Sequence, residues 1–180
     1  NRDPFKPQPV ESAIETWLGN PDDEQRFFRG PDACDYWRAH PEGHFFLLRG
    51  YTEDSTDKVK SAGTVMDVTL PIWRMGEILL FASRLAKSLG DDPEIMIVSE
   101  FTGLHKRRLV RLDGYSFDLG HRCIDDTVHI EAQATAQVIE DNLAEVLLPF
   151  LRPLYERFSF YELDPRLVTR ELERLRKRRS

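Results

Sequence analysis

The clearest hydrophobic pattern in the chain runs from Pro71 to Leu89 and predicts a helix. Pro71 suits the first helical turn, and Gly90 stands where helices commonly end in left-handed geometry. Apolar side chains recur at alternating steps of three and four residues: Ile72, Met75, Leu79, Ala82, Ala86 and Leu89. A second apolar side is formed by Trp73, Leu80 and Phe81. We therefore expect this helix to be buried on two sides, one against a sheet and the other against another helix or a second subunit.

Helical patterns also occur near both ends of the chain. Residues 10–18, 22–29 and 31–40 are expected to form three short helices, each ended by glycine or proline. Thr135 can cap a further helix, whose apolar stripe continues to Leu154. We expect that helix to kink or break at its two prolines, Pro149 and Pro153. A final helix is predicted to begin at Asp164 and Pro165.

The segments between these helices carry strand patterns. Strands are expected at residues 44–51, 63–70, 94–101, 106–112 and 127–134, the first of them buried and the last half-solvated. The turn signal at 102–105 predicts a hairpin of 94–101 with 106–112. Residues 52–62 read as a loop and 115–126 as irregular structure. This order indicates an α+β fold, a mostly antiparallel sheet of about five strands with helices packed on one face.

Length and composition indicate one folded domain. The 180 residues and their 41% apolar content suffice for a packed core. We interpret the proline-rich residues 1–9 as a linker and residues 10–180 as a single α+β domain with a basic C-terminal helix. The sequence shows no signal peptide and no apolar run of about 18 residues, so we expect no membrane contact and a cytoplasmic protein. Two distant cysteines, Cys34 and Cys123, fit reduced thiols there.

Charge is distributed unevenly along the chain. Residues 166–180 carry seven basic and two acidic side chains, a net charge of +5, which leaves −11 for the rest of a chain whose total is −6. An acidic body does not attract nucleic acid at long range. Contact with a polyanion would therefore use the tail, through Arg174, Arg176, Lys177, Arg178 and Arg179. The alternative is that these cations only stabilise the C-terminal end of their helix.

Common catalytic signatures do not occur in the sequence. It lacks a phosphate loop, a dinucleotide-binding glycine motif, a zinc-protease helix, paired cysteines and a nucleophile elbow, so we expect neither an enzyme nor a cofactor. The densest set of metal-binding side chains is His121 and Cys123, with Asp125, Asp126 and His129 nearby. Structural zinc sites usually pair two such modules, and His129 should point to solvent. We therefore expect a loop with a partly buried cysteine and no metal there.

Five residues of the 71–89 helix are candidates for a ligand site or an interface: Trp73, Arg74, Glu77, Phe81 and Arg84. One interpretation is that the charged members form a narrow solvent-exposed stripe. The other is that they make polar contacts inside a pocket or between subunits.

Three segments resemble a known group of proteins: EGHFFLLRGYTEDSTDK, GTVMDVTLPIWRMGEILLFASRLAKSLG and QVIEDNLAEVLLPFLRPLYERFSFYEL. They are similar to the C-terminal region of bacterial DNA-binding proteins with an N-terminal AlbA/Schlafen-type domain, described as transcriptional regulators or ATP-binding proteins. The resemblance spans about residues 31–163 and carries over no functional residue. It implies an accessory domain, with nucleic-acid binding located in the N-terminal domain of the full-length protein.

We therefore expect a non-catalytic regulatory, sensor or oligomerisation domain. Its partners would be a second copy of the chain or other domains of the same protein. Two alternatives remain: an enzyme or metal-binding domain using the His121–Cys123 loop, and direct nucleic-acid binding through the basic final helix.

Overall fold

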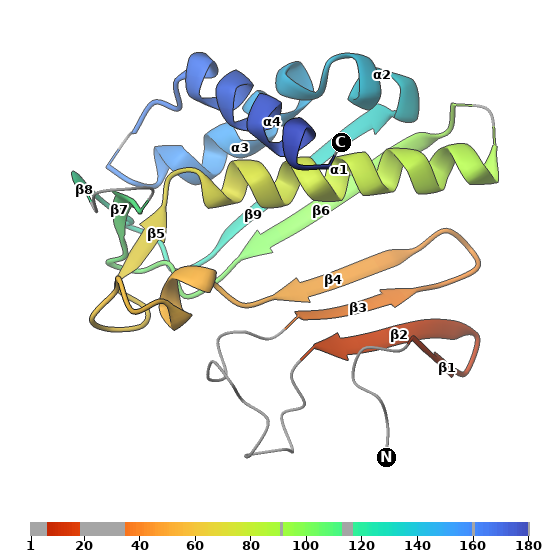
Figure 1. Cartoon of the computed structure of the whole chain (residues 1–180), viewed down its shortest axis with the longest axis horizontal. Helices are drawn as coiled ribbons and strands as arrows, with labels where there is room; N and C mark the ends of the chain where they lie inside the picture. Colours follow the sequence, from red (N-terminus) through yellow and green to blue (C-terminus); the bar gives the residue numbers. More distant parts are fainter. Residues whose placement is uncertain (1–6, 19–34, 91, 113–116, 160, 180) are drawn as a thin grey trace. The chain divides into compact units, whose positions relative to one another are not determined.

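The computed structural model confirms an α+β fold (Figure 1). It describes residues 7–18, 35–90, 92–112, 117–159 and 161–179. The chain divides into two compact units, residues 1–62 and 63–180. The boundary between them lies inside residues 10–180, which the sequence assigns to one domain. Within these described ranges, three sheets of four, three and two strands take the place of the expected sheet of about five strands.

The N-terminal unit contains an antiparallel meander of four strands. These are β1 (Gln8–Val10), β2 (Ala13–Leu18), β3 (Asp35–Ala39) and β4 (Phe45–Arg49), paired in chain order. A 3₁₀ turn, η2, follows at Thr52–Ser55 within the expected loop.

The helices predicted at 10–18 and 31–40 are therefore wrong where the structure describes those residues. Within β2, Ile14 and Leu18 are four residues apart, and four is a multiple of the strand period as well as close to one helical turn. The positive φ of Glu11, 53°, lies at the turn from β1 to β2, where a helix would need a negative value. The helix predicted at 22–29 lies outside the described residues.

Strand β4 confirms the predicted strand at 44–51 but not its full burial. Phe46 and Leu48 are 55% and 51% exposed, whereas Phe45 and Leu47 are half-buried. Successive side chains of a strand point to opposite faces, so a run of apolar residues places half of them on each face. A continuous run of apolar residues in a strand therefore does not establish that both faces of the strand are buried.

The C-terminal unit contains two sheets. Strands β5 (Val65–Asp67), β7 (Arg108–Arg111) and β8 (Phe117–Arg122) form one, with β5 parallel to β7. Strands β6 (Glu94–Phe101) and β9 (Val128–Thr135) form the other, antiparallel over eight pairs of residues.

The predicted hairpin of 94–101 with 106–112 is wrong, because the chain continues past the turn signal instead of reversing. The Leu104 N–H donates to the Asp126 carbonyl at 2.9 Å, and the Lys106 N–H donates to the Cys123 carbonyl at 3.1 Å. These bonds connect the β6–β9 pairing to the β7–β8 pairing as one bent ribbon. The segment expected to be irregular, 115–126, contains β8, which includes Gly120 with φ of 78°. The pairing of β8 with β7 shifts register between Arg108 and Val110.

The helix predicted at 71–89 is confirmed as α1 (Leu70–Leu89), although Gly90 has an extended φ of 172° and not a left-handed one. The helix after Thr135 is divided into α2 (Ala136–Asp141) and α3 (Leu143–Glu156). The division falls at Asn142, and α3 runs through both of its prolines. The final helix is confirmed as α4 (Pro165–Arg179). None of the helices in the described ranges has the length and apolar character needed to cross a membrane.

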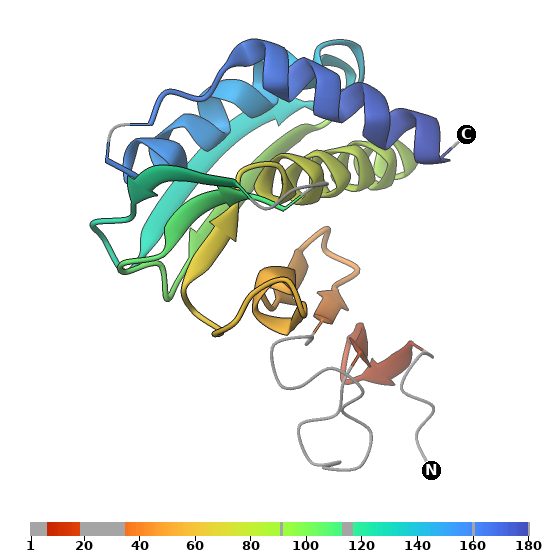
Figure 2. The same cartoon turned by 60° about the vertical axis from the view of Figure 1, so that its left-hand side comes forward.

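Figure 2 shows α1, α3 and α4 gathered on one side of the strands of the C-terminal unit. The core between them is formed mainly by Met66, Ile72, Leu79, Leu109, Leu147, Leu151, Leu154 and Leu175. Gly76 allows α4 to approach α1, because a methyl group at that position would lie 2.7 Å from Cδ2 of Leu172. Val128 and Ile130 of β9 are buried and His129 and Glu131 are exposed, which confirms the predicted alternation.

Candidate functional site

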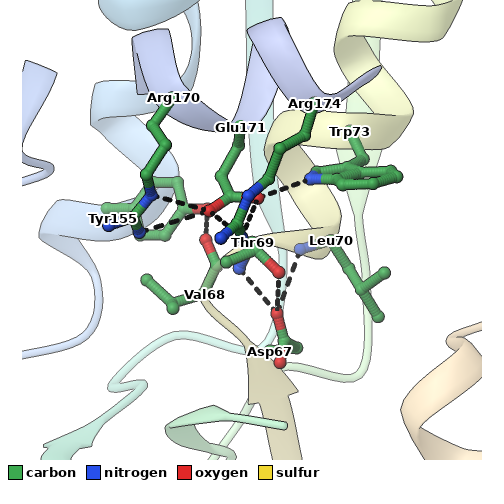
Figure 3. Close-up of polar contacts among 9 residues, drawn as sticks. All are labelled: Asp67, Val68, Thr69, Leu70, Trp73, Tyr155, Arg170, Glu171 and Arg174. Carbon is green, nitrogen blue, oxygen red and sulfur yellow. Dashed lines mark hydrogen bonds and ion pairs between the residues drawn. The ribbon is translucent and has the colours of Figure 1, made fainter. Parts of the chain in front are cut away.

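The start of α1 is held by the buried carboxylate of Asp67, which is 2% exposed. Its Oδ1 accepts hydrogen bonds from the Thr69 N–H at 2.7 Å, the Thr69 hydroxyl at 2.6 Å and the Leu70 N–H at 3.2 Å (Figure 3). Its Oδ2 accepts from the Leu112 N–H at 2.6 Å. The negative charge satisfies otherwise unpaired donors at the helix N-terminus and lies at the positive end of the helix dipole. Asp67 therefore positions α1 relative to the strands.

A second buried carboxylate, Glu171 of α4, joins α4 to α1 (Figure 3). Its Oε2 accepts from Nε1 of Trp73 at 3.1 Å, across 98 residues of sequence. Its Oε1 accepts from Nε of Arg170 at 3.2 Å and from Nη1 of Arg174 at 3.0 Å. A carboxylate that is 2% exposed and paired with two guanidinium groups is compensated, and it is poorly placed to act as a general base. Trp73 and Arg174, two of the sequence candidates, thus serve in helix packing.

The other α1 candidates lie toward the outside of the helix. Phe81 is 46% exposed and Arg84 is exposed, while Arg74 and Glu77 are half-buried. With about 100° of rotation per residue, Phe81 points nearly opposite to the buried Ile72. It belongs to an apolar row that we call the outer stripe of α1: Ile78, Phe81, Ala82, Leu85 and Leu89. Sequence reasoning selected only Phe81 for the site and placed Ala82 and Leu89 on the same apolar side as the buried Ile72 and Leu79, whereas Leu89 is 62% exposed.

The basic candidates of α4 are partly engaged within the fold. Arg174 contacts Glu171, and Nη2 of Arg176 donates to the Glu140 carbonyl of α2 at 3.2 Å. Lys177 is exposed, and the side chains of Arg178 and Arg179 lie outside the described part of the structure. The tail is therefore not wholly available to an external polyanion.

The candidate ligands His121, Cys123 and His129 each have a separate local partner. Cys123 is 2% exposed with Sγ 3.3 Å from the Asp125 carbonyl, and desolvation by burial raises the pKa of its thiol. The His121 ring packs edge-on against Tyr161, with ring centroids 5.1 Å apart. Nε2 of His129 lies 2.9 Å from a carboxylate oxygen of Glu131. The structure does not bring the three together as a ligand set.

A different group with metal-binding chemistry lies at the β3–β4 hairpin. His40, Glu42 and His44 place one ligand atom each within 4.8 Å of one another, and we call them the hairpin triad. It is the one such group of three or more found in the described ranges. Sequence reasoning treated Pro41–Glu42–Gly43 only as a helix breaker. The available signal was a histidine on each side of a tight turn with a carboxylate at its tip.

The functional candidates thus occupy separate places: a buried polar network, an exposed apolar stripe on α1, a basic helix end and a histidine-rich hairpin. The network is structural, and the other three are on the surface. Comparison of this chain with models of protein families, with curated proteins and with solved structures found no significant match.

Proposed function

We propose that this chain is a non-catalytic association module, and that two copies bind each other through the outer stripe of α1. The observation that carries the proposal is the unequal covering of this helix. Ile72 and Leu79 on its inner side are 0% exposed, whereas Phe81 and Leu89 on the outer stripe are 46% and 62% exposed. Large apolar side chains that recur along one helix side and stay exposed are typical of interaction surfaces.

The charges beside the stripe favour a second copy as the occupant. Glu77 and Arg84 are seven residues apart, so they lie on the same flank of α1. In an antiparallel pair of α1 helices with a two-fold axis beside Phe81, Glu77 of each copy meets Arg84 of the other. The pair therefore forms two equivalent contacts between opposite charges. In a parallel arrangement Glu77 would instead lie opposite Glu77 of the second chain, and Arg84 opposite Arg84, so that like charges would meet.

This proposal extends to a regulatory role through the resemblance of the three sequence segments to accessory regions of bacterial DNA-binding proteins. Dimerisation of an accessory domain would hold two DNA-binding domains together, as half-site recognition requires. The non-catalytic part of the proposal is supported by the compensated state of Asp67 and Glu171 and by the separation of His121, Cys123 and His129.

Light scattering coupled to size-exclusion chromatography tests the association. The full chain is expected to elute with the mass of a dimer, and Phe81→Glu is expected to elute as a monomer, because its carboxylate would be desolvated in the interface. The matched control is Met96→Glu, which alters an apolar side chain of β6 that is 65% exposed and lies outside the stripe. The control is expected to remain a dimer.

A charge exchange tests the antiparallel geometry. Glu77→Arg and Arg84→Glu should each weaken the dimer, because each places like charges opposite each other twice. The double variant Glu77→Arg/Arg84→Glu restores opposite charges and should recover most of the dimer. A wild-type chain that is monomeric at high concentration, or a double variant no better than the single ones, contradicts the proposal.

A further inference from the structure

We propose that the hairpin triad binds a divalent transition-metal ion of the Zn²⁺ type. Two imidazoles and one carboxylate are the ligand combination that such ions accept, whereas Mg²⁺ and Ca²⁺ prefer sites made of oxygen atoms. Nδ1 of His40 lies 3.7 Å from Oε2 of Glu42. In a tetrahedral site with bonds of roughly 2.0–2.1 Å, two ligand atoms lie roughly 3.3 Å apart. A small side-chain rotation would therefore bring these two atoms to the separation that two ligands of one tetrahedral ion have.

The hairpin backbone places the two histidines side by side. The His40 N–H donates to the His44 carbonyl at 2.8 Å, and the Gly43 N–H donates to the His40 carbonyl at 3.0 Å. Gly43 has φ of 87°, a left-handed value that glycine adopts without strain and that closes the turn. Residues that face each other across an antiparallel pair share a face of the sheet. The two imidazole rings accordingly stack, 6.2 Å apart at an angle of 29°.

Ser12 provides an outer contact that would orient His40. Its Oγ lies 2.7 Å from Nε2 of His40, on the opposite side of the ring from Nδ1. With Nδ1 bound to a metal, Nε2 carries the proton and donates it to the serine hydroxyl. Such outer partners fix the tautomer and direction of ligating histidines.

The surroundings of the triad are compatible with a bound cation. The nearby guanidinium of Arg38 is paired with Glu11 at 3.5 Å, which offsets its charge. The Glu42 N–H donates to Nδ1 of His40 at 3.3 Å, a long hydrogen bond that metal binding would replace. The His40 and Glu42 side chains are 26% and 73% exposed, so water can reach the ion. With three protein ligands, the fourth position of a tetrahedral ion would hold water.

Calorimetric titration of the metal-free full chain, without an affinity tag, tests the site. We expect one Zn²⁺ per chain, no measurable heat with Mg²⁺ or Ca²⁺, and a Co²⁺ complex with visible absorption. His40→Ala and His44→Ala should each weaken Zn²⁺ binding at least tenfold, and Ser12→Ala by about tenfold.

The matched control is His129→Ala, which removes an exposed histidine that also has a carboxylate neighbour but lies on β9. It should bind Zn²⁺ as the wild type does. His44→Gln, which retains most of the side-chain volume, separates loss of a ligand from loss of the hairpin, and far-ultraviolet circular dichroism checks that each variant is folded. Absence of stoichiometric Zn²⁺ binding, or an equal effect of His129→Ala and His44→Ala, overturns the proposal. Either result leaves the proposal of an α1 dimer untouched, because that proposal is tested by light scattering and not by metal binding.

Discussion

Cys123 shows how burial determines the chemistry of one side chain. Desolvation raises the pKa of its thiol, so at neutral pH its thiolate fraction is below that of a free cysteine. In a Cys34→Ser background, we expect iodoacetamide at pH 8 to modify native Cys123 much more slowly than a free thiol, and to modify it rapidly in denaturant. Mass spectrometry over time measures both rates. Equal rates in the native and denatured chain would show that the thiol is accessible.

The same shift has a consequence for stability. The folded chain keeps the Cys123 proton to a higher pH than the unfolded chain does, whose thiol has a pKa of about 8.5. The contribution of the protonated Cys123 thiol to the free energy of unfolding is therefore complete below the pKa of the unfolded chain. It is lost as the pH rises from that value toward the higher pKa of the folded chain. Denaturant melts at pH 7 and at higher pH should show this loss in Cys34→Ser and a smaller loss in Cys34→Ser/Cys123→Ala. The second variant removes the thiol from both states.

Single residues of the candidate sites were only partly predictable. The caps formed by Thr135 and Asp164 are confirmed, with Thr135 Oγ1 accepting from the Val138 N–H at 3.4 Å and Asp164 Oδ1 accepting from the Arg166 N–H at 2.8 Å. Both contacts span two or three residues, so the sequence contains them. The Trp73–Glu171 contact spans 98 residues, and no local pattern indicates it.

At the scale of elements, the close packing of α1 on α4 depends on Gly76. Gly76→Ala would gain about 1 kcal/mol of helix propensity but would place a methyl group 2.7 Å from Cδ2 of Leu172 and 3.2 Å from Cδ2 of Leu175. Overpacking of this kind costs roughly 1–3 kcal/mol. We therefore expect a net decrease of about 1 kcal/mol in the free energy of unfolding, measured by urea denaturation.

A double-mutant cycle separates this packing effect from helix propensity. Leu172→Ala alone should cost about 2–5 kcal/mol by leaving a cavity. In Gly76→Ala/Leu172→Ala the new methyl group occupies part of that space, so the double variant should be more stable than the sum of the single changes predicts. Additive effects would mean that the two helices adjust their distance freely.

Helices and strands were predicted correctly where the spacing of apolar residues fitted only one kind of element. They were missed where the spacing fitted both the helical and the strand period. Helix α1 has a long apolar repeat of threes and fours, which no strand reproduces, and its predicted bounds are nearly those observed. In β2, Ile14 and Leu18 are four residues apart, a spacing that fits a helix and a strand equally well. Strand β6 was predicted correctly, but its partner was not, because β9 lies more than 25 residues further along the chain.

For the whole molecule, the α+β class follows from local sequence patterns that predict helices and strands. The division into sheets depends instead on which strands pair, and the paired strands can lie far apart in the sequence. The bent ribbon brings Glu94 opposite Thr135 at one end and Arg111 opposite Phe117 near the other. A turn signal at 102–105 could not distinguish a bend in this ribbon from a hairpin, since both need the same residue types.

The charge distribution of the whole chain predicts weak binding to nucleic acid. The net charge of −6 repels a polyanion, and Arg174 and Arg176 of the basic helix already contact Glu171 and the Glu140 carbonyl. We expect no binding of the isolated chain to fluorescent double-stranded DNA in anisotropy titrations at about 150 mM salt, because few phosphate contacts remain to release counterions. Replacement of Lys177, Arg178 and Arg179 with alanine, which leaves the core residue Leu175 in place, should remove any residual signal at low salt. Tight binding at about 150 mM salt that disappears in this variant would instead make the end of α4 a nucleic-acid interface, since only a strong local field could then outweigh the acidic body.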